Sequence, residues 1–283
     1  MLNSSLKKEA IKELEKEVKN YDNSRESVQK AALNLHNSRT SALEVIDNVE
    51  RYINSIAHTP KEFDKEFEEI HVNTASFKAL SDITYDEKLM IKIAGGGAAA
   101  GVAAGVATAA LAPTVALAIA TTFGTASTGA AISGLTGAAA TNAALAWLGG
   151  GALAAGGGGM AAGNALLALA GPIGWDIGAA SLVAGGVYAS KKNKDGAMKA
   201  DKERLEITKE RRKLDALQYE IAELNAITKK LMNELYKLIT NFTNEARDVT
   251  SFHQYSPNQR QELIAIINNT SSLSKLFMKE IGK

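Results

Sequence analysis

Hydrophobic residues recur at helical spacing along the N-terminal arm of the chain. Steps of three, four and seven residues place apolar side chains on one face of an α-helix. One such stripe runs through Leu14, Val18, Tyr21, Val28, Ala32 and Leu35 and resumes at Ala42, Ile46, Val49, Ile53 and Ile56. Glycine and proline are absent before Pro60, so the pattern predicts one helix of about 50 residues. A helix of that length needs a partner alongside it.

The sequence Thr59-Pro60-Lys61-Glu62 predicts the start of a second helix. Threonine can cap the first turn, proline fits that turn, and the following glutamate provides the other half of a capping box. The apolar side of this helix carries Phe63, Phe67, Ile70, Phe77 and Leu80. A further start of the same kind, Thr84-Tyr85-Asp86-Glu87, leads into the central part of the chain.

The C-terminal arm has the most regular pattern of apolar positions. Its seam alternates steps of three and four residues, with Thr228 as the one polar member, through Leu214, Leu217, Ile221, Leu224, Leu231, Leu235, Leu238 and Phe242. This spacing predicts a coiled-coil helix of about four heptads. After a polar break at Ser256-Pro257-Asn258, a last short helix is predicted, with an apolar face of Leu263, Ile266, Ile267, Leu273 and Phe277. No stretch alternates with the period of a strand, so we expect an all-α fold, an elongated helical bundle with coiled-coil arms.

The centre of the chain has a different composition. Between Ile93 and Trp175 there are 83 residues without a charged side chain, most of them alanine and glycine. Of the 24 glycines, 22 fall between residues 93 and 190, where Asp176 is the only ionisable group. A water-facing surface is not built this way, so the stretch must be covered by a bilayer or by the rest of the chain. We therefore divide the chain into an N-terminal helical arm (1–89), a hydrophobic segment (90–190) and a C-terminal coiled-coil arm (191–283).

The hydrophobic segment is long enough for about four membrane-spanning helices of some 20 residues each. Turn signals at Pro113, 124–129, 149–151 and Gly171-Pro172 divide it accordingly. Glycines spaced four residues apart form one row on a helix and let another backbone approach closely. Such glycine-zipper spacing occurs at Gly97, Gly101 and Gly105, at Gly159 and Gly163, and at Gly174 and Gly178. A single pair can arise by chance in so glycine-rich a stretch, but the triple predicts helix packing.

Other residues mark the expected membrane interface. Trp147 and Trp175 lie beside chain breaks, where indole rings favour the bilayer surface. Asp176 either caps the helix that follows or lines a polar, proton-sensitive path at membrane depth, and the cap is the simpler interpretation. Lys191 and Lys192 are expected at the end of the last apolar helix.

The first expected spanning helix is only weakly hydrophobic. Its insertion-favouring residues sum to roughly −2 kcal/mol before the cost of the glycines. Between residues 93 and 112 they are Ile93, Val102, Val106 and Leu111. Marginal insertion combined with long amphipathic arms favours a segment that is sheltered in water and inserted later.

The charge distribution and the absence of known motifs argue against nucleic-acid binding, metal binding and catalysis. Residues 1–92 carry 14 Lys and Arg against 17 Asp and Glu, and residues 191–283 carry 18 against 13, so neither arm has the strongly basic face of a nucleic-acid-binding protein. There is no cysteine, and the four histidines are scattered without metal-site spacing. The run Gly157–Ala162 satisfies a loose dinucleotide motif, but no strand precedes it. We expect no enzyme activity, cofactor, metal or small-molecule substrate.

Long helical arms around one Gly/Ala-rich hydrophobic insertion resemble the α-helical pore-forming toxins of the cytolysin A and tripartite-haemolysin type. The resemblance lies in architecture and length over the whole chain and involves no diagnostic motif. It implies a bundle that shelters a hydrophobic segment in a soluble form and inserts it on oligomerisation, with a lipid membrane and further copies or companion toxin subunits as partners. The uncharged block is longer than that family's usual insertion. Type III secretion translocators have a similar layout, and the run 139–151 with Gly156–Gly159 resembles glycine-zipper segments of bacterial membrane proteins.

We therefore expect a membrane-inserting, pore-forming helical protein whose arms (about 1–85 and 195–283) pack as an antiparallel bundle. An even number of membrane passes would return both arms to one side. One alternative is a constitutive bacterial membrane scaffold whose coiled-coil arms recruit partners, and another is a soluble protein with the Ala/Gly block as its core. Residues 1–14 are rich in Lys and Glu and lack an apolar core, so no cleavable signal peptide is expected. The protein would be soluble or secreted before insertion and membrane-bound afterwards.

Overall fold

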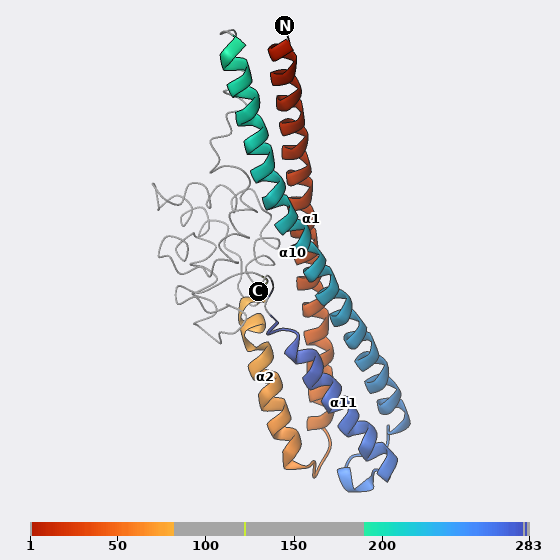
Figure 1. The fold of residues 1–283 in the computed structure, drawn as a ribbon. Coiled ribbons are helices and arrows are strands. Elements are labelled where there is room, and N and C mark those ends of the chain that lie inside the picture. The colour runs from red at the N-terminus through yellow and green to blue at the C-terminus, as the bar shows by residue number, and fades with distance from the viewer. Residues whose placement is uncertain (1, 82–121, 123–189, 280, 282–283) are drawn as a thin grey trace, which may run out of the picture.

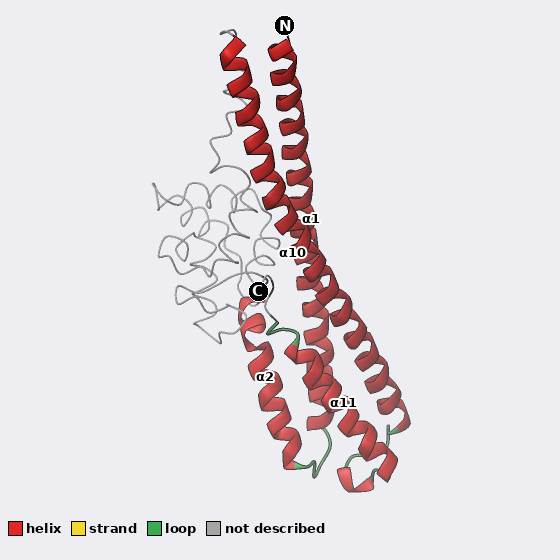
Figure 2. Cartoon of the chain, in the orientation of Figure 1, coloured by secondary structure: helices red, strands yellow, loops and turns green. Residues whose placement is uncertain are grey.

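The computed structural model describes residues 2–81, 122, 190–279 and 281. Within them the chain forms helices α1 (Leu2–Asn54), α2 (Lys61–Ser81), α10 (Ser190–Glu245) and α11 (Pro257–Lys275) and a short 3₁₀ helix, η3 (Phe252–Gln254) (Figure 1). The described residues contain no strand, only an isolated parallel bridge between Ala57 and Ser251 (Figure 2). The all-α prediction is confirmed for this part of the chain.

The predicted starts of α2 and α11 and the predicted length of α1 agree with the structure, whereas α10, with 56 residues, is about twice as long as the four heptads predicted for it. Helix α1 runs for 53 residues without interruption, as expected from a stretch that lacks glycine and proline. Helix α2 begins at Lys61, directly after the proline that was expected in its first turn. At the start of α11, the backbone N–H of Gln259 donates to Ser256 Oγ at 3.3 Å, and Gln259 Oε1 accepts from the Ser256 N–H at 3.0 Å. This capping box explains why the polar break ends at Pro257.

The two long helices lie side by side and run in the same direction. Glu17 pairs with Arg211 near one end, and further along both helices the Tyr52 ring packs against Phe242 with centroids 5.9 Å apart. Residue numbers at these contacts increase together along α1 and α10, so the two helices are parallel (Figure 1). The expected antiparallel packing of the arms is therefore wrong for the long helices. Each arm folds back on itself at its own turn, so antiparallel neighbours occur within each arm, α1 with α2 and α10 with α11.

Buried positions follow a seven-residue repeat along both long helices. In α1 they are Leu14, Tyr21, Val28, Leu35, Ala42 and Val49, and in α10 they are Ala200, Ile207, Leu214, Ile221, Thr228, Leu235 and Phe242. One predicted seam residue is wrong: Leu238 is 42% exposed, whereas its neighbour Ile239 is buried. An α-helix has 3.6 residues per turn, so a strict seven-residue repeat drifts around it, and the buried stripe shifts to Ile239 and Ala246 toward the end of α10.

The main hydrophobic core lies in the half of the bundle where all four helices are present. Its members come from α1, α2, α10 and α11 and include Ile46, Val49, Phe67, Ile70, Leu235, Phe242, Leu263 and Ile266. In the other half, α1 and α10 continue as a two-helix coiled coil (Figure 1). The turns at the base are joined by two main-chain hydrogen bonds of 2.8 Å, from the Ala57 N–H to the Thr250 carbonyl and from the Phe252 N–H to the Ala57 carbonyl.

Candidate functional site

Most of the residues predicted to pack or anchor membrane helices lie outside the described part of the chain. These are Gly97, Gly101, Gly105, Gly159, Gly163, Gly174, Gly178, Trp147, Trp175 and Asp176. Lys191 and Lys192 fall in the first turn of α10. No helix in the described ranges combines the length and the apolar character that a bilayer crossing requires. The candidate site is therefore built from the helices that flank the hydrophobic segment.

A cluster of four side chains surrounds the end of α2, shortly before the hydrophobic segment begins. His36 and Arg39 come from α1, Phe77 from α2 and Phe277 from the turn after α11. The Phe77 ring centroid lies 5.2 Å from that of His36 and 5.2 Å from that of Phe277. We call these four residues the exit cluster, because they fix the point where the chain leaves the described bundle.

Arg39 is a buried cation within the exit cluster. Its side chain is 1% exposed, Nη2 donates to the Leu276 carbonyl at 2.9 Å, and the guanidinium carbon lies 6.0 Å from the Phe277 centroid. Among the described residues, its Nε has no hydrogen-bond partner. Burial lowers the pKa of Arg39 to about 10. A buried charge without an opposite charge costs several kcal/mol, so the turn after α11 supplies the main compensation for this one.

His36 is a second buried titratable group beside Arg39. Its side chain is 8% exposed, and Nδ1 has no hydrogen-bond partner in the part of the chain that the structure describes. Burial lowers the pKa of His36, and the neighbouring charge of Arg39 lowers it further. Protonation of His36 would place two positive charges together in a dry environment. The exit cluster therefore places two titratable groups inside the interface between the helices.

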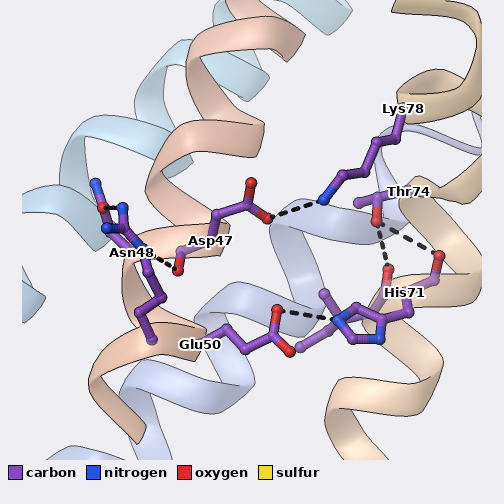
Figure 3. Close-up of polar contacts among 8 residues, drawn as sticks. Asp47, Asn48, Glu50, His71, Thr74 and Lys78 are labelled. Atoms are coloured by element: carbon purple, nitrogen blue, oxygen red, sulfur yellow. Dashed lines mark hydrogen bonds and ion pairs between the residues drawn. The ribbon is translucent and has the colours of Figure 1, made fainter. Parts of the chain in front are cut away.

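Polar pairs join α2 to α1 beside this cluster (Figure 3). Lys78 Nζ lies 3.7 Å from Asp47 Oδ1, and His71 Nε2 lies 3.0 Å from Glu50 Oε2. On α2 itself, the Thr74 hydroxyl donates to the Ile70 carbonyl at 3.0 Å. Exposed pairs of this kind contribute about 0–1 kcal/mol each. They orient α2 without binding it tightly.

Side chains of α2 also contact α11. Asn73 Nδ2 donates to Ser274 Oγ at 3.0 Å, and Lys275 Nζ lies 3.1 Å from Glu69 Oε1. Ser274 is buried. The two short helices therefore contact each other as well as their own long helices, which ties both arms together at the level of the exit cluster.

A second polar cluster lies between α1 and α10 in the coiled coil. Arg211 Nε donates to Glu17 Oε1 at 2.8 Å and Nη1 to Asp215 Oδ2 at 2.9 Å, while the Ser24 hydroxyl donates to Asp215 Oδ1 at 2.6 Å. Burial acts to raise the pKa of Glu17, but hydrogen bonds from Arg211 and Asn20 outweigh it and lower that pKa. The hydrogen bond to Glu17 raises the pKa of Arg211. Polar contacts at a coiled-coil seam fix direction and register, and these contacts match only the parallel arrangement.

Neither cluster was foreseen from the sequence. The contacts between α1 and α10 depend on helix direction, which a stripe of apolar positions does not encode. One signal for the exit cluster was present: Arg39 lies four residues after Leu35 and three before Ala42, on the apolar stripe itself. A charged residue on a core-facing stripe marks a buried ion or a special contact.

Compared with known protein families, curated proteins and solved structures, the chain matches no family model, no curated protein and no structure. The case for a function therefore depends on the residues and contacts of the chain itself.

Proposed function

We propose that this chain is a membrane-inserting, pore-forming helical protein. In this proposal the four described helices form a handle, and residues 90–190 form the membrane-active part. The observation that carries the proposal is the run of 83 uncharged, mostly small residues between Ile93 and Trp175, flanked on both sides by helices rich in charge. Such a run suits lipid as its surroundings and does not suit water.

The geometry of the handle supports a change of shape on insertion. Phe77, near the end of α2, lies beside His36, whereas a side chain added at Gly196, near the start of α10, would meet that of Lys7 at 3.3 Å. His36 and Lys7 are 29 residues apart on α1, which corresponds to about 44 Å of helix. The chain thus leaves and re-enters the described bundle at widely different levels. A segment that crosses a membrane an even number of times starts and ends on the same side of it, and so at the same level of the bundle. In this proposal, α2 therefore moves along the bundle before or during insertion.

The exit cluster is the proposed release point for that movement. The pairs that hold α2 on α1 are exposed and weak, and the contact with the C-terminal turn includes the poorly compensated charge of Arg39. Opening there hydrates a buried cation, which offsets part of the cost of separating apolar side chains. The long coiled coil can stay intact while the short helices part.

A constitutive membrane scaffold is the second candidate, favoured by a row of exposed side chains on α10. Met198, Leu205 and Tyr219 are 63%, 54% and 74% exposed and share a seven-residue spacing with the exposed Arg212. Such a row suits a partner helix. The two candidates differ in extraction, because the scaffold requires detergent at all times whereas the pore-forming protein has a form that is soluble without it.

Leakage of a trapped dye from lipid vesicles tests the proposal. The wild-type protein should release the dye, and Gly101→Leu should slow release at least tenfold, because leucine fills the groove that close helix packing needs. Gly196→Leu is the matched control, since Gly196 lies in α10 and the atoms nearest to a Cβ added there belong to the flexible Lys7 side chain. Vesicles that stay intact with wild type and control alike would overturn the proposal.

A further inference from the structure

Two histidines that are 195 positions apart in sequence meet at the base of the bundle. His58 lies in the turn between α1 and α2, and His253 lies in η3 between α10 and α11. Their ring centroids are 5.5 Å apart, with 32° between the ring planes, and both side chains are exposed. The sequence gives no hint of this pair, because the two residues come together only when the arms pack in parallel.

Backbone hydrogen bonds hold together the two turns that carry the histidines. The hydrogen bonds between Ala57 and the segment Thr250–Phe252 lie directly next to each histidine. The His253 carbonyl accepts from Arg260 Nη2 at 2.9 Å. These bonds join the two turns and fix the positions of the two backbones that carry the imidazoles.

His58 also has the features of an oriented ligand. Its φ is 58°, in the left-handed region that costs a non-glycine residue roughly 1 kcal/mol. Its Nδ1 lies 3.2 Å from Ser251 Oγ. Histidines that bind metal commonly engage an oxygen through one ring nitrogen and leave the other nitrogen for the ion. The Ser251 contact leaves Nε2 of His58 for that purpose.

The separation of the rings fits a shared ion. Zinc lies about 2.0–2.1 Å from a histidine nitrogen, so two imidazoles on one tetrahedral ion have their centroids about 5 Å apart. The observed value is 5.5 Å. We propose that His58 and His253 form a two-histidine site for a divalent transition-metal ion of the Zn²⁺, Ni²⁺ or Cu²⁺ type, which ties the turn of one arm to the turn of the other.

The surroundings predict a modest affinity. Within the described ranges, no group of three or more His, Asp or Glu side chains is arranged to hold a metal, so water completes the coordination. Arg260, whose guanidinium carbon lies 5.3 Å from the Phe252 ring centroid, adds a positive charge to the same turn. The ion would bind the packed arms in preference to separated ones and would therefore stabilise the bundle.

The test uses the full-length protein and Ni²⁺. Urea unfolding is followed by far-UV circular dichroism at neutral pH, with and without NiCl₂. With free Ni²⁺ at ten times its Kd, the folding equilibrium constant should rise about 11-fold. His58→Asn removes the imidazole and keeps a residue that tolerates positive φ, and His253→Ala removes the other ligand. His71→Ala is the matched control, because His71 is an exposed histidine that pairs with Glu50 on a different face.

The metal-free midpoint of each variant is measured first, and the Ni²⁺ shift is taken relative to it. The site is supported if the shift disappears in both His58→Asn and His253→Ala and persists in His71→Ala. The absence of any Ni²⁺ shift in the wild type at millimolar concentration overturns the site. A Ni²⁺ shift that persists in His58→Asn or in His253→Ala also overturns the site. Neither result bears on membrane insertion.

Discussion

At the scale of single residues, the exit cluster brings a guanidinium and an imidazole into the interior of the bundle. Arg39 and His36 lie next to each other under Phe77 and Phe277, with one carbonyl oxygen as the hydrogen-bond acceptor of the guanidinium. Buried ionic groups of this kind are usually less stabilising than apolar side chains of the same size. In the function proposed above, this contact is the one that opens.

Replacement of Arg39 by methionine should stabilise the closed bundle. Methionine keeps the length of the side chain and removes the charge, so we expect the free energy of unfolding to rise by about 1–3 kcal/mol. Arg39→Ala leaves a cavity in the same place and should lower it by a similar amount or more. Urea unfolding followed by circular dichroism measures both changes. A loss of stability in Arg39→Met as large as that in Arg39→Ala would show that the charge itself supports the fold.

The stability of the bundle should fall as the pH drops through the titration of His36. Because burial lowers the pKa of His36 in the folded state, the unfolded chain takes up its proton first, near pH 6.5. Neutral His36 thus makes its full contribution to the stability of the bundle above that pH. This contribution is lost as the pH falls through the lowered pKa of the folded state. Urea midpoints at about pH 7.5 and pH 5 should differ less in His36→Leu than in the wild type. Equal differences in the two proteins would show that His36 does not cause the loss of stability at low pH.

At the scale of elements, helix existence was predictable and helix direction was not. The absence of glycine and proline before Pro60, together with the Ser256-Pro257 break, fixed where α1 and α11 end and begin. A stripe of apolar positions, however, fits a partner in either direction. Direction follows from polar contacts such as that of Glu17 with Arg211, and their partners are known only once the register is known. The shift from Leu238 to Ile239 was missed because the predicted seam kept a strict seven-residue repeat, which drifts around a helix of 3.6 residues per turn.

Charge reversal tests the parallel register of α1 and α10. Arg211→Glu places a negative charge beside Glu17 and Asp215 and should lower the free energy of unfolding by about 1–2 kcal/mol. Adding Glu17→Arg should recover part of this loss, because the new pair is again attractive. A double-mutant cycle measures the coupling between the two positions. A coupling energy near zero would contradict the contact and, with it, the register.

At the scale of the whole molecule, the proposed insertion requires α2 and α11 to separate while the coiled coil of α1 and α10 stays together. The chain has no cysteine, so disulfides can be introduced without a background of native thiols. Asn73→Cys with Ser274→Cys joins the short helices at a point where their side chains already touch. The oxidised protein should lose vesicle leakage, and reduction should restore it.

The matched control carries Ala57→Cys with Ser251→Cys, the two residues of the parallel bridge. This pair ties the turns together and leaves the exit cluster free, so leakage should continue in both redox states. If the cross-link between residues 73 and 274 leaves leakage unchanged, the short helices do not need to separate. The proposed release at the exit cluster would then be wrong even if the protein permeabilises membranes.

The central claim is that residues 90–190 enter lipid while the arms remain in water. Its most direct test places a single cysteine with an environment-sensitive dye at Ala139, within the uncharged run, or at the exposed Tyr219 on α10. On addition of vesicles, the dye at residue 139 should shift its emission to the blue and become accessible to a quencher dissolved in the bilayer, whereas the dye at residue 219 should do neither. Emission at residue 139 that stays unchanged by vesicles which the protein demonstrably binds would contradict the account.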